Sequence, residues 1–384
     1  MFKFIDLFAG IGGFHLGMHS IDGHCVFASE IDKFARQTYE YNYKRYSPEV
    51  FEEREGEFKL FNEDITTVTE KEDLDKIPEF DVLCAGFPCQ PFSHAGLKKG
   101  FGDTRGTLFF NIEQIVKNKI ENGTPPKVLF LENVKGLKGH DKGHTFKTIV
   151  EHLHALGYHV QAEVLNSKHF GVPQNRERIF IIAWYKDAIP VQEGEFKFPW
   201  GIDQDGEPFY EYSKRDNVAV STRVGDVLFT DKEIRLEEKR RKEESARAAI
   251  YTISDKLWEG HKNRIKKHKA NGNGFGYSLF KDDSPYTSTI SARYYKDGSE
   301  ALIYQEDRNP RKLHPIEAAK LQGYPVEEDP TKGLRPKGDA PNDDKFYIPV
   351  SDTQAYKQFG NSVSVPVIKA LAKEIKEQLL DKSK

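Results

Sequence analysis

The chain has 384 residues, of which 38% are hydrophobic and 30% charged, and this length predicts a globular protein of two units. Its formal net charge of −3 does not by itself indicate a nucleic-acid binder. No apolar run approaches the roughly 20 residues of a membrane-spanning helix, and the first residues do not resemble a signal peptide. We therefore expect a cytoplasmic protein without a membrane segment.

Short apolar runs alternate with helical patterns in the first half of the chain, which is typical of a doubly wound, mainly parallel α/β sheet. The expected strands cover 3–8, 24–29, 80–85, 128–132, 159–165 and 178–184, and the expected helices cover 14–19, 33–41, 108–119 and 145–156. After about residue 188 this alternation stops, and a less regular unit follows. It contains a highly charged stretch at 231–269 and a β-like segment at 287–304, before a last helix at 364–380.

A glycine-rich run, Asp6-Leu7-Phe8-Ala9-Gly10-Ile11-Gly12-Gly13, follows the first expected strand and opens a helix. Such glycines allow a ligand to approach the backbone closely. Glu30 ends the second strand about 20 residues after Gly10, where a carboxylate accepts hydrogen bonds from a ribose. His15 occupies the place of the third small residue of a dinucleotide motif, which disfavours a NAD enzyme. An adenosine-bearing cofactor and a ligand-free tight turn both remain open.

Cys89 follows a buried strand in Gly86-Phe87-Pro88-Cys89-Gln90-Pro91, at the sheet edge where open α/β folds bind ligands. The flanking prolines stiffen this turn, which favours a catalytic thiol. Cys25 and Cys84 lie in apolar runs and are interpreted as core residues. The three cysteines cannot all pair, and their spacing matches no zinc site, so we expect no metal. The loop 94–106 is either a lid over an anionic substrate or an ordinary surface loop.

An acid and two arginines stand at the ends of further strands. Glu132 ends an apolar strand, where burial favours its protonated, hydrogen-bond-donating form. Arg176 and Arg178 alternate before the next apolar run and so share one face of the chain. Such a pair orients a carboxylate or a pyrimidine carbonyl, although structural salt bridges have the same appearance.

Taken in order, six segments resemble the successive motifs of the DNA (cytosine-5)-methyltransferases, and they extend over nearly the whole chain. They are 6–13, 86–93, 132–134, 174–178, 311–325 and 358–367. The resemblance implies a Rossmann-like catalytic and S-adenosylmethionine-binding domain over 1–187. It also implies a smaller, irregular target-recognition domain over 188–354 with a supporting helix in 311–325, and a segment 355–384 that returns to the first domain.

The resemblance also implies a mechanism on a cytosine flipped out of duplex DNA. Cys89 attacks C6, Glu132 holds and protonates N3, and Arg178 with Arg176 supports the O2 edge. The implied cofactor contacts are Phe8, Gly10, Ile11, Gly13, Glu30, Ile31, Asp64, Ile65, Gly86, Leu108, Asn361 and Ser362. Ile31 stands where relatives often have an aromatic residue, which predicts weaker adenine stacking.

The implied DNA contacts are Ser93 and Arg105 on the closing loop and Arg293, Tyr294, Tyr295 and Lys296 in the recognition region. Segments 272–277 and 289–298 resemble those of methylases that act on CCWGG or CCNGG sites. A surface hairpin is the alternative for the four residues Arg293 to Lys296, and a solvated helix is the alternative to a phosphate-binding helix in 231–269. We expect a monomer that methylates double-stranded DNA in a restriction–modification system, with a separate cognate restriction endonuclease. The other hypotheses are a tRNA cytosine-5 methyltransferase and a catalytically silent DNA-binding homologue.

Overall fold

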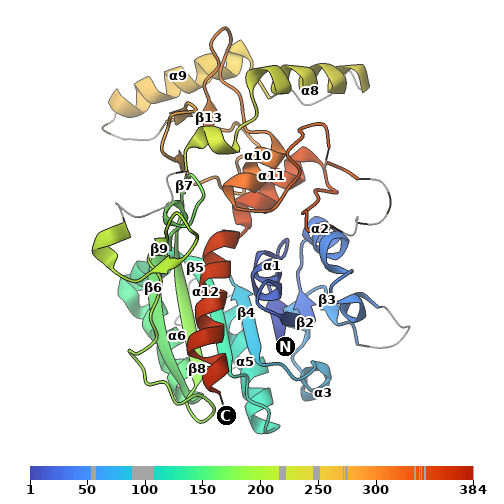
Figure 1. Cartoon of the computed structure of the whole chain (residues 1–384), viewed down its shortest axis with the longest axis vertical. Helices are drawn as coiled ribbons and strands as arrows, with labels where there is room; N and C mark the ends of the chain where they lie inside the picture. The colour runs from blue at the N-terminus through green and yellow to red at the C-terminus, as the bar shows by residue number, and fades with distance from the viewer. Residues whose placement is uncertain are drawn as a thin grey trace.

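A twisted sheet forms the centre of the lower part of the molecule (Figure 1). The computed structural model describes residues 1–52, 58–88, 108–215, 222–244, 251–270, 272, 276–332, 334–336, 338, 340 and 343–383. Within these residues the sheet has seven strands in the order β3–β2–β1–β4–β5–β8–β6. The strands are β1 (Phe2–Leu7), β2 (Gly23–Ser29), β3 (Phe61–Asn62), β4 (Val82–Gly86), β5 (Val128–Val134), β6 (Tyr158–Asn166) and β8 (Glu177–Tyr185).

The sheet is mainly parallel, as the sequence predicts. β1 pairs in parallel with β2 and β4, and β4 with β5, whereas β8 runs antiparallel to both β5 and β6. All six strands expected from the sequence are present, and their ends differ from the expected ones by no more than a few residues. The two-residue strand β3 lies just before Asp64, where the sequence suggests a further short strand.

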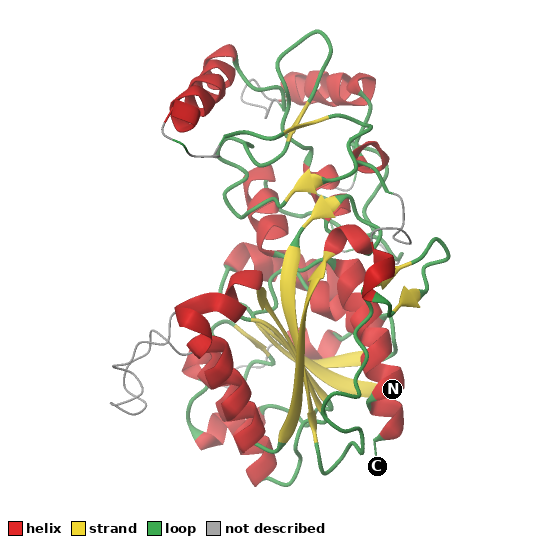
Figure 2. Ribbon diagram, turned by 90° about the vertical axis from the view of Figure 1, so that its left-hand side faces the viewer, coloured by secondary structure: helices red, strands yellow, loops and turns green. Residues whose placement is uncertain are grey.

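Helices cover both faces of the sheet, as Figure 2 shows from the side. One face packs against α1 (Gly13–His19), α2 (Lys33–Tyr43) and α12 (Val365–Gln378), and the other against α3 (Lys71–Lys76), α5 (Leu108–Glu121) and α6 (His144–Ala155). Successive side chains of β5 point to opposite faces of the sheet. Val128 and Phe130 pack on the face covered by α1, α2 and α12, and Leu129 and Leu131 pack on the face covered by α3, α5 and α6. The burial of apolar side chains on both faces explains the near-continuous apolar strands of this sequence.

The last helix returns to the first domain. α12 lies against α1, and a Cβ placed at Gly17 of α1 would come within 2.4 Å of Ile368 Cγ2. This close helix contact brings residues near the end of the chain beside the glycine-rich turn that precedes α1. The expected helix at 364–380 is therefore present, and its packing places the preceding residues near the carboxyl edge of the sheet.

A second unit lies above the sheet in Figure 1 and holds α8 (Asp231–Glu244), α9 (Asp255–Ala270), α10 (Pro315–Leu321) and α11 (Asp352–Asn361). Its strands are short: β11 (Leu279–Phe280), β12 (Thr287–Ser288) and β13 (Leu302–Ile303). β12 pairs with β7 (Gln174–Asn175), which joins this unit to the end of the catalytic sheet. The pair β9 (Gly201–Ile202) and β10 (Pro208–Phe209) lies beside the sheet, where Lys373 of α12 binds Glu207 between the two strands. The β-like segment expected at 287–304 is strand only at its two ends, in β12 and β13, and a series of turns separates these strands.

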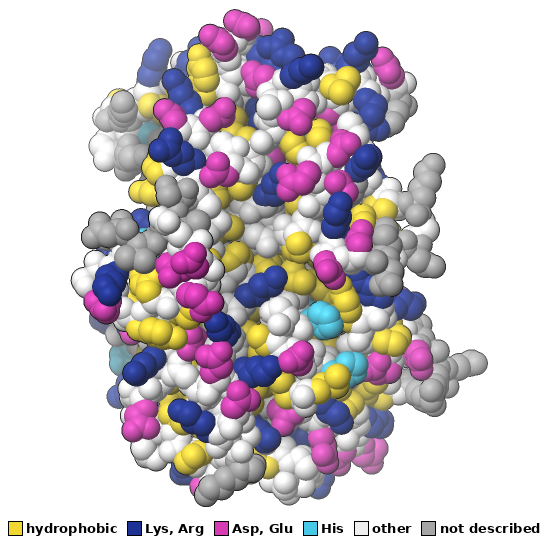
Figure 3. Space-filling view, viewed as in Figure 1, with side chains coloured by type: hydrophobic (Ala, Val, Ile, Leu, Met, Phe, Trp, Pro, Cys, Tyr) yellow, Lys and Arg dark blue, Asp and Glu magenta, His cyan; other side chains and the backbone are white. Residues whose placement is uncertain are grey.

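Charges of both signs are interspersed over the face seen in Figure 3, in keeping with the small net charge. The charged stretch expected as one helix divides into α8 and α9. On α8, Arg241 is buried and binds Glu237 and Asp352, so it belongs to the interior of the second unit. On α9, Lys266 and Lys267 are exposed. Among the described residues no helix is long and apolar enough to cross a membrane.

Candidate active site

The glycine-rich turn after β1 has an unusual backbone conformation. Phe8 has a φ of 55°, a left-handed value that is uncommon for a residue with a side chain, and Gly12 has a φ of 80°. A Cβ placed at Gly10 would meet no atom within 4 Å, so the turn borders open space at this point. The backbone here is accessible to a ligand in the way the sequence predicts.

Glu30 ties this turn to the end of β2. Its two carboxylate oxygens accept hydrogen bonds from the backbone N–H of Gly10 at 2.8 Å and of Asp32 at 2.7 Å. Burial raises the pKa of Glu30, while these two N–H donors lower it. A carboxylate has about four acceptor positions, so Glu30 retains capacity to accept ribose hydroxyls.

His15 lies beneath the turn rather than in it. Its ring stacks on that of Tyr43 at a centroid distance of 4.1 Å, and its Nδ1 lies 2.8 Å from the Tyr39 hydroxyl. The Tyr43 hydroxyl in turn donates to the carbonyls of Gly12 at 2.7 Å and Ile11 at 3.3 Å. This explains why a large residue is tolerated at position 15. Tyr43 is a supporting residue that no sequence motif revealed.

The other expected cofactor residues border the same edge of the sheet. Ile31 follows β2 and is 71% exposed, so its side chain is accessible to a ligand. Asp64 caps a short helical turn by accepting from Thr66 N, and Ile65 beside it is buried. Gly86 ends β4, and Leu108, half-buried, begins α5.

Asn361 and Ser362 reach this edge from the far end of the chain, as expected. The Ser362 hydroxyl lies 2.7 Å from the Tyr324 hydroxyl, while Asn361 is exposed. A Cβ placed at Gly13 would lie 2.5 Å from Val363 Cγ2 and 3.5 Å from Ser362 Oγ. The bend between α11 and α12 is therefore pressed directly against the glycine-rich turn.

Glu132, near the end of β5, is buried and forms an ion pair with Arg178 of β8, with Arg178 Nε 3.1 Å from Glu132 Oε1. Burial raises the pKa of Glu132, and the charges of Arg178 and then Arg176 oppose that rise. A Cβ placed at Gly86 would lie 3.5 Å from Glu132 Oε2, which sets the acid beside the end of β4. An acid with a raised pKa next to an arginine is suited to hold a polar heterocycle.

Arg176 has different partners. Its side chain is 1% exposed and donates to the carbonyls of Ile290, Gly360 and Ser362 at 3.2, 3.1 and 2.6 Å. Burial lowers its pKa to about 9. The two arginines expected to act together thus hydrogen-bond in different directions, Arg178 towards Glu132 and Arg176 towards three main-chain carbonyls.

Cys89, Ser93 and Arg105 lie outside the described residues. The chain just before Cys89 is fixed by Asn133, whose side-chain amide donates to the Phe87 carbonyl at 2.8 Å. Asn133 follows Glu132 directly, so β5 positions both the acid and the start of the loop that carries the thiol. Cys25 and Cys84 are fully buried, which confirms their interpretation as core residues.

The residues expected to contact DNA in the recognition region form a turn. Arg293 and Lys296 are exposed and Tyr295 is half-buried. Tyr294 is fully buried, donates to the Ala301 carbonyl and accepts from Leu313 N. The expected DNA contact by Tyr294 is therefore wrong for this structure: its side chain supports the turn from inside.

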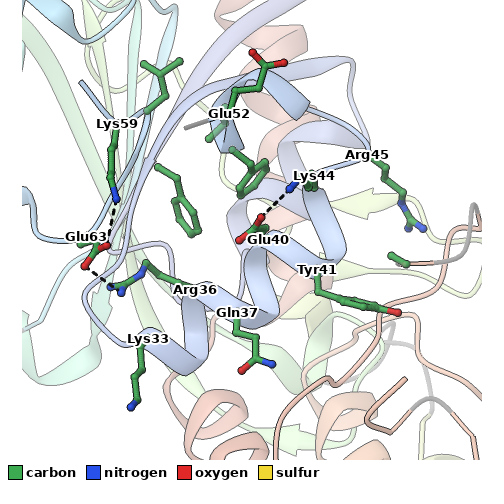
Figure 4. A pocket seen from close by; sticks show the side chains of 15 residues that line it. Lys33, Arg36, Gln37, Glu40, Tyr41, Lys44, Arg45, Glu52, Lys59 and Glu63 are labelled. Atoms are coloured by element: carbon green, nitrogen blue, oxygen red, sulfur yellow. Dashed lines mark hydrogen bonds and ion pairs between the residues drawn. The ribbon is translucent and has the colours of Figure 1, made fainter. Parts of the chain in front are cut away.

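A separate pocket of about 950 Å³ lies between α2 and β3 (Figure 4). Its charged side chains include three ion pairs, in which Arg36 and Lys59 both bind Glu63 and Lys44 binds Glu40. None of the expected cofactor or catalytic residues lines it. Elsewhere in the described residues, no cluster of His, Cys, Asp and Glu could hold a metal ion.

The fold and the buried Glu132–Arg178 pair indicate an α/β enzyme whose site lies at the carboxyl edge of its sheet. The family model for C-5 cytosine-specific DNA methylase matches residues 2–377, so the chain belongs to this family and is a DNA (cytosine-5-)-methyltransferase.

Individual relatives cover nearly all of the chain. The type II methyltransferase M.NlaX of Neisseria lactamica is 48% identical over 381 residues, which are 99% of this chain and 97% of the relative. M1.ScrFI of Lactococcus lactis subsp. cremoris is 46% identical over 384 residues, covering 100% and 80%. The crystal structure of S. pombe Dnmt2 methyltransferase matches 98% of this chain and 99% of its own, with a TM-score of 0.63 and 20% identity, which supports the fold alone.

Proposed function

We propose that this enzyme methylates C5 of a cytosine within a short duplex DNA sequence, with Cys89 as the nucleophile. The observation that carries the proposal is the buried pair of Glu132 and Arg178, 3.1 Å apart. It lies beside Gly86, at the end of the strand that leads to Cys89. A flipped pyrimidine placed there meets an acid and an arginine from neighbouring strands, and the adjacent strand leads along the chain to the proposed nucleophile Cys89.

The methyl donor is S-adenosylmethionine, and the residues present fit it. Open space beside Gly10, the carboxylate of Glu30 and the exposed side chain of Ile31 suit a ribose and an adenine. The rest of the adenosine side is formed by Asp64, Ile65, Gly86 and Leu108. The methionine side is closed by Asn361 and Ser362. The bound cofactor supplies an electrophilic methyl group, and the residues of the chain prepare cytosine to accept it.

The Cys89 thiolate adds to C6 and forms a C–S bond, which moves electron density to C5. Glu132, with its raised pKa, donates a proton to N3 and so neutralises the charge that addition places on the ring. Arg178 donates to the O2 edge while it holds the Glu132 carboxyl in place. After C5 is methylated, a base such as a water molecule takes the C5 proton and the C–S bond breaks, which restores the aromatic ring and the Cys89 thiolate. N3 returns its proton to Glu132.

Double-stranded DNA is the proposed partner. Its proposed contacts are the exposed Arg293 and Lys296, the half-buried Tyr295, and Ser93 and Arg105. The recognition segments 272–277 and 289–298 favour a target of the CCNGG type. Protection of host DNA from a separate restriction endonuclease is the proposed setting, and we propose a monomeric, cytoplasmic protein.

Bisulfite sequencing tests the proposal. Unmethylated plasmid is incubated with S-adenosylmethionine and the wild-type enzyme, Cys89→Ser, or Cys84→Ala as a matched control in a buried thiol. We expect protected cytosines at one short motif with the wild type and with Cys84→Ala, and none with Cys89→Ser. Protection by Cys89→Ser excludes Cys89 as the nucleophile, and a motif unlike CCNGG refutes the recognition-segment hypothesis alone. If no cytosine is protected by the wild type, methylation of DNA is refuted and RNA becomes the substrate to assay.

A further inference from the structure

The bend between α11 and α12 contacts the recognition segment as well as the cofactor side of the sheet. In Figure 1, α11 lies on the side of the second unit that faces the sheet. A Cβ placed at Gly360, the next-to-last residue of α11, would lie 2.2 Å from Ser291 C and 2.4 Å from Ala292 N. Only a glycine permits the two backbones to approach this closely without displacing the segment that leads into the Arg293–Lys296 turn.

Arg176 holds the same two segments together from beneath. One guanidinium nitrogen donates to Ile290, just before Ser291, while the other donates to Gly360 and Ser362. The side-chain amide of Gln174 contributes two more bonds: its Oε1 accepts from Ile290 N, and its Nε2 donates to the Leu321 carbonyl. These residues are far apart in sequence, since Arg176 and Gly360 are 184 positions apart.

Beyond this contact the bend continues into the site. Ser362 lies against Tyr324, and Val363 lies beside Gly13 and Gly86, whose neighbour is Glu132. α11 is also anchored on α2, because Gln358 accepts from Thr38 and donates to the Phe34 carbonyl. A shift of segment 290–292 therefore cannot occur without moving Gly360 and the bend, or breaking the bonds of Arg176.

We propose that Gly360 and Arg176 are positioning residues that couple recognition of the DNA sequence to binding of S-adenosylmethionine. A DNA target that fixes the position of the Arg293–Lys296 turn also fixes the position of the Ser362–Val363 bend. This bend borders the cofactor site on its methionine side. By thermodynamic linkage the cofactor then tightens binding of the target by the same factor. The inference rests on the proposed function, because it assumes that the turn meets DNA and that the bend meets the cofactor.

The test measures the dissociation constant of S-adenosylhomocysteine by calorimetry, with and without a saturating duplex that carries the motif found by bisulfite sequencing. The ratio of the two constants is the coupling factor. Gly360→Ala adds a methyl group that separates α11 from the backbone of Ser291 and Ala292. Arg176→Lys keeps the positive charge but lacks the planar guanidinium that binds three carbonyls. Tyr324→Phe removes only the bond to Ser362, so it is a milder variant. Gly260→Ala is the matched control, since Gly260 is also in a helix but a Cβ there meets nothing within 4 Å.

We expect a wild-type factor of about 5 to 150, the usual range of such couplings, and the same factor in Gly260→Ala. In Gly360→Ala and Arg176→Lys it should fall at least about fivefold towards one, with a smaller fall in Tyr324→Phe. With a duplex in which one base of the motif is changed, the wild-type enzyme should show a coupling factor as low as that of the variants. A wild-type factor of one, or an unchanged factor in every folded variant, overturns the inference even if the wild type methylates DNA. Absence of plasmid methylation by the wild type would instead refute the proposed function.

Discussion

Arg178 Nε lies 3.1 Å from Glu132 Oε1, across the antiparallel strands β5 and β8. In the strand register Glu132 stands opposite Phe180 and Arg178 opposite Val134, so the pair is diagonal. Diagonal neighbours are within reach of long side chains. The contact leaves the second oxygen of Glu132 near Gly86, towards the end of the strand that precedes Cys89.

Glu132→Gln should lower the rate of methyl transfer by about 10²- to 10⁴-fold, the usual contribution of a positioned acid. DNA binding should remain, because the amide keeps the shape of the side chain. Single-turnover methylation and a DNA-binding assay measure the two effects. Glu163→Gln is the matched control, since Glu163 stands opposite the same Phe180 from the strand on its other side. A loss of less than about tenfold in Glu132→Gln would remove this acid from the mechanism.

Replacement of Arg178 by Gln should change the pH at which the rate of methyl transfer falls. Burial raises the pKa of Glu132 and the Arg178 charge lowers it, so Arg178→Gln should raise that pKa further. If the protonated acid is the active form, the rate falls as pH rises through its pKa. The alkaline fall should therefore move to higher pH in Arg178→Gln, after each profile is scaled to its maximum. Lys135→Gln, which breaks an exposed ion pair with Glu177, should leave the profile in place. A shift to lower pH in Arg178→Gln would contradict this assignment.

Ile31→Trp should tighten cofactor binding about two- to twelvefold, because an aromatic ring adds about 0.5–1.5 kcal/mol of stacking. The exposed position of Ile31 leaves room for the larger side chain. Calorimetry with S-adenosylhomocysteine measures the change. Leu236→Trp, at another exposed position on α8, serves as control and should have no effect. An unchanged affinity in Ile31→Trp would place the adenine elsewhere.

Tyr43→Phe should weaken cofactor binding about fivefold. It removes the hydroxyl that donates to the carbonyls of Gly12 and Ile11, and one hydrogen bond contributes about 1 kcal/mol. Tyr158→Phe is the control, because its buried hydroxyl donates to the Pro126 carbonyl, which is not part of the glycine-rich turn. Equal losses in both variants would indicate a general effect on stability, which thermal melting of both would reveal.

Six strands of the sheet with their places along the chain, the glycine-rich turn, Glu30 and the position of Glu132 were all predictable from the sequence. Each follows from local properties: the period of apolar residues sets the type of element, and the end of a strand sets which edge a side chain occupies. The broken segment between β12 and β13 was not predictable, because its short strands depend on partners elsewhere, such as β7.

The sequence alone determined which residues stand at the ends of the strands, because that depends only on neighbours along the chain. The tertiary structure decided which of them meet. Arg176 and Arg178 are two positions apart, yet only Arg178 pairs with Glu132, while Arg176 binds Gly360. Tyr294 and Tyr295 are the same residue type side by side, yet Tyr295 is half-buried while Tyr294 is fully buried and hydrogen-bonded to Ala301 and Leu313. Contacts of this kind arise from packing between distant segments, and no local pattern encodes them.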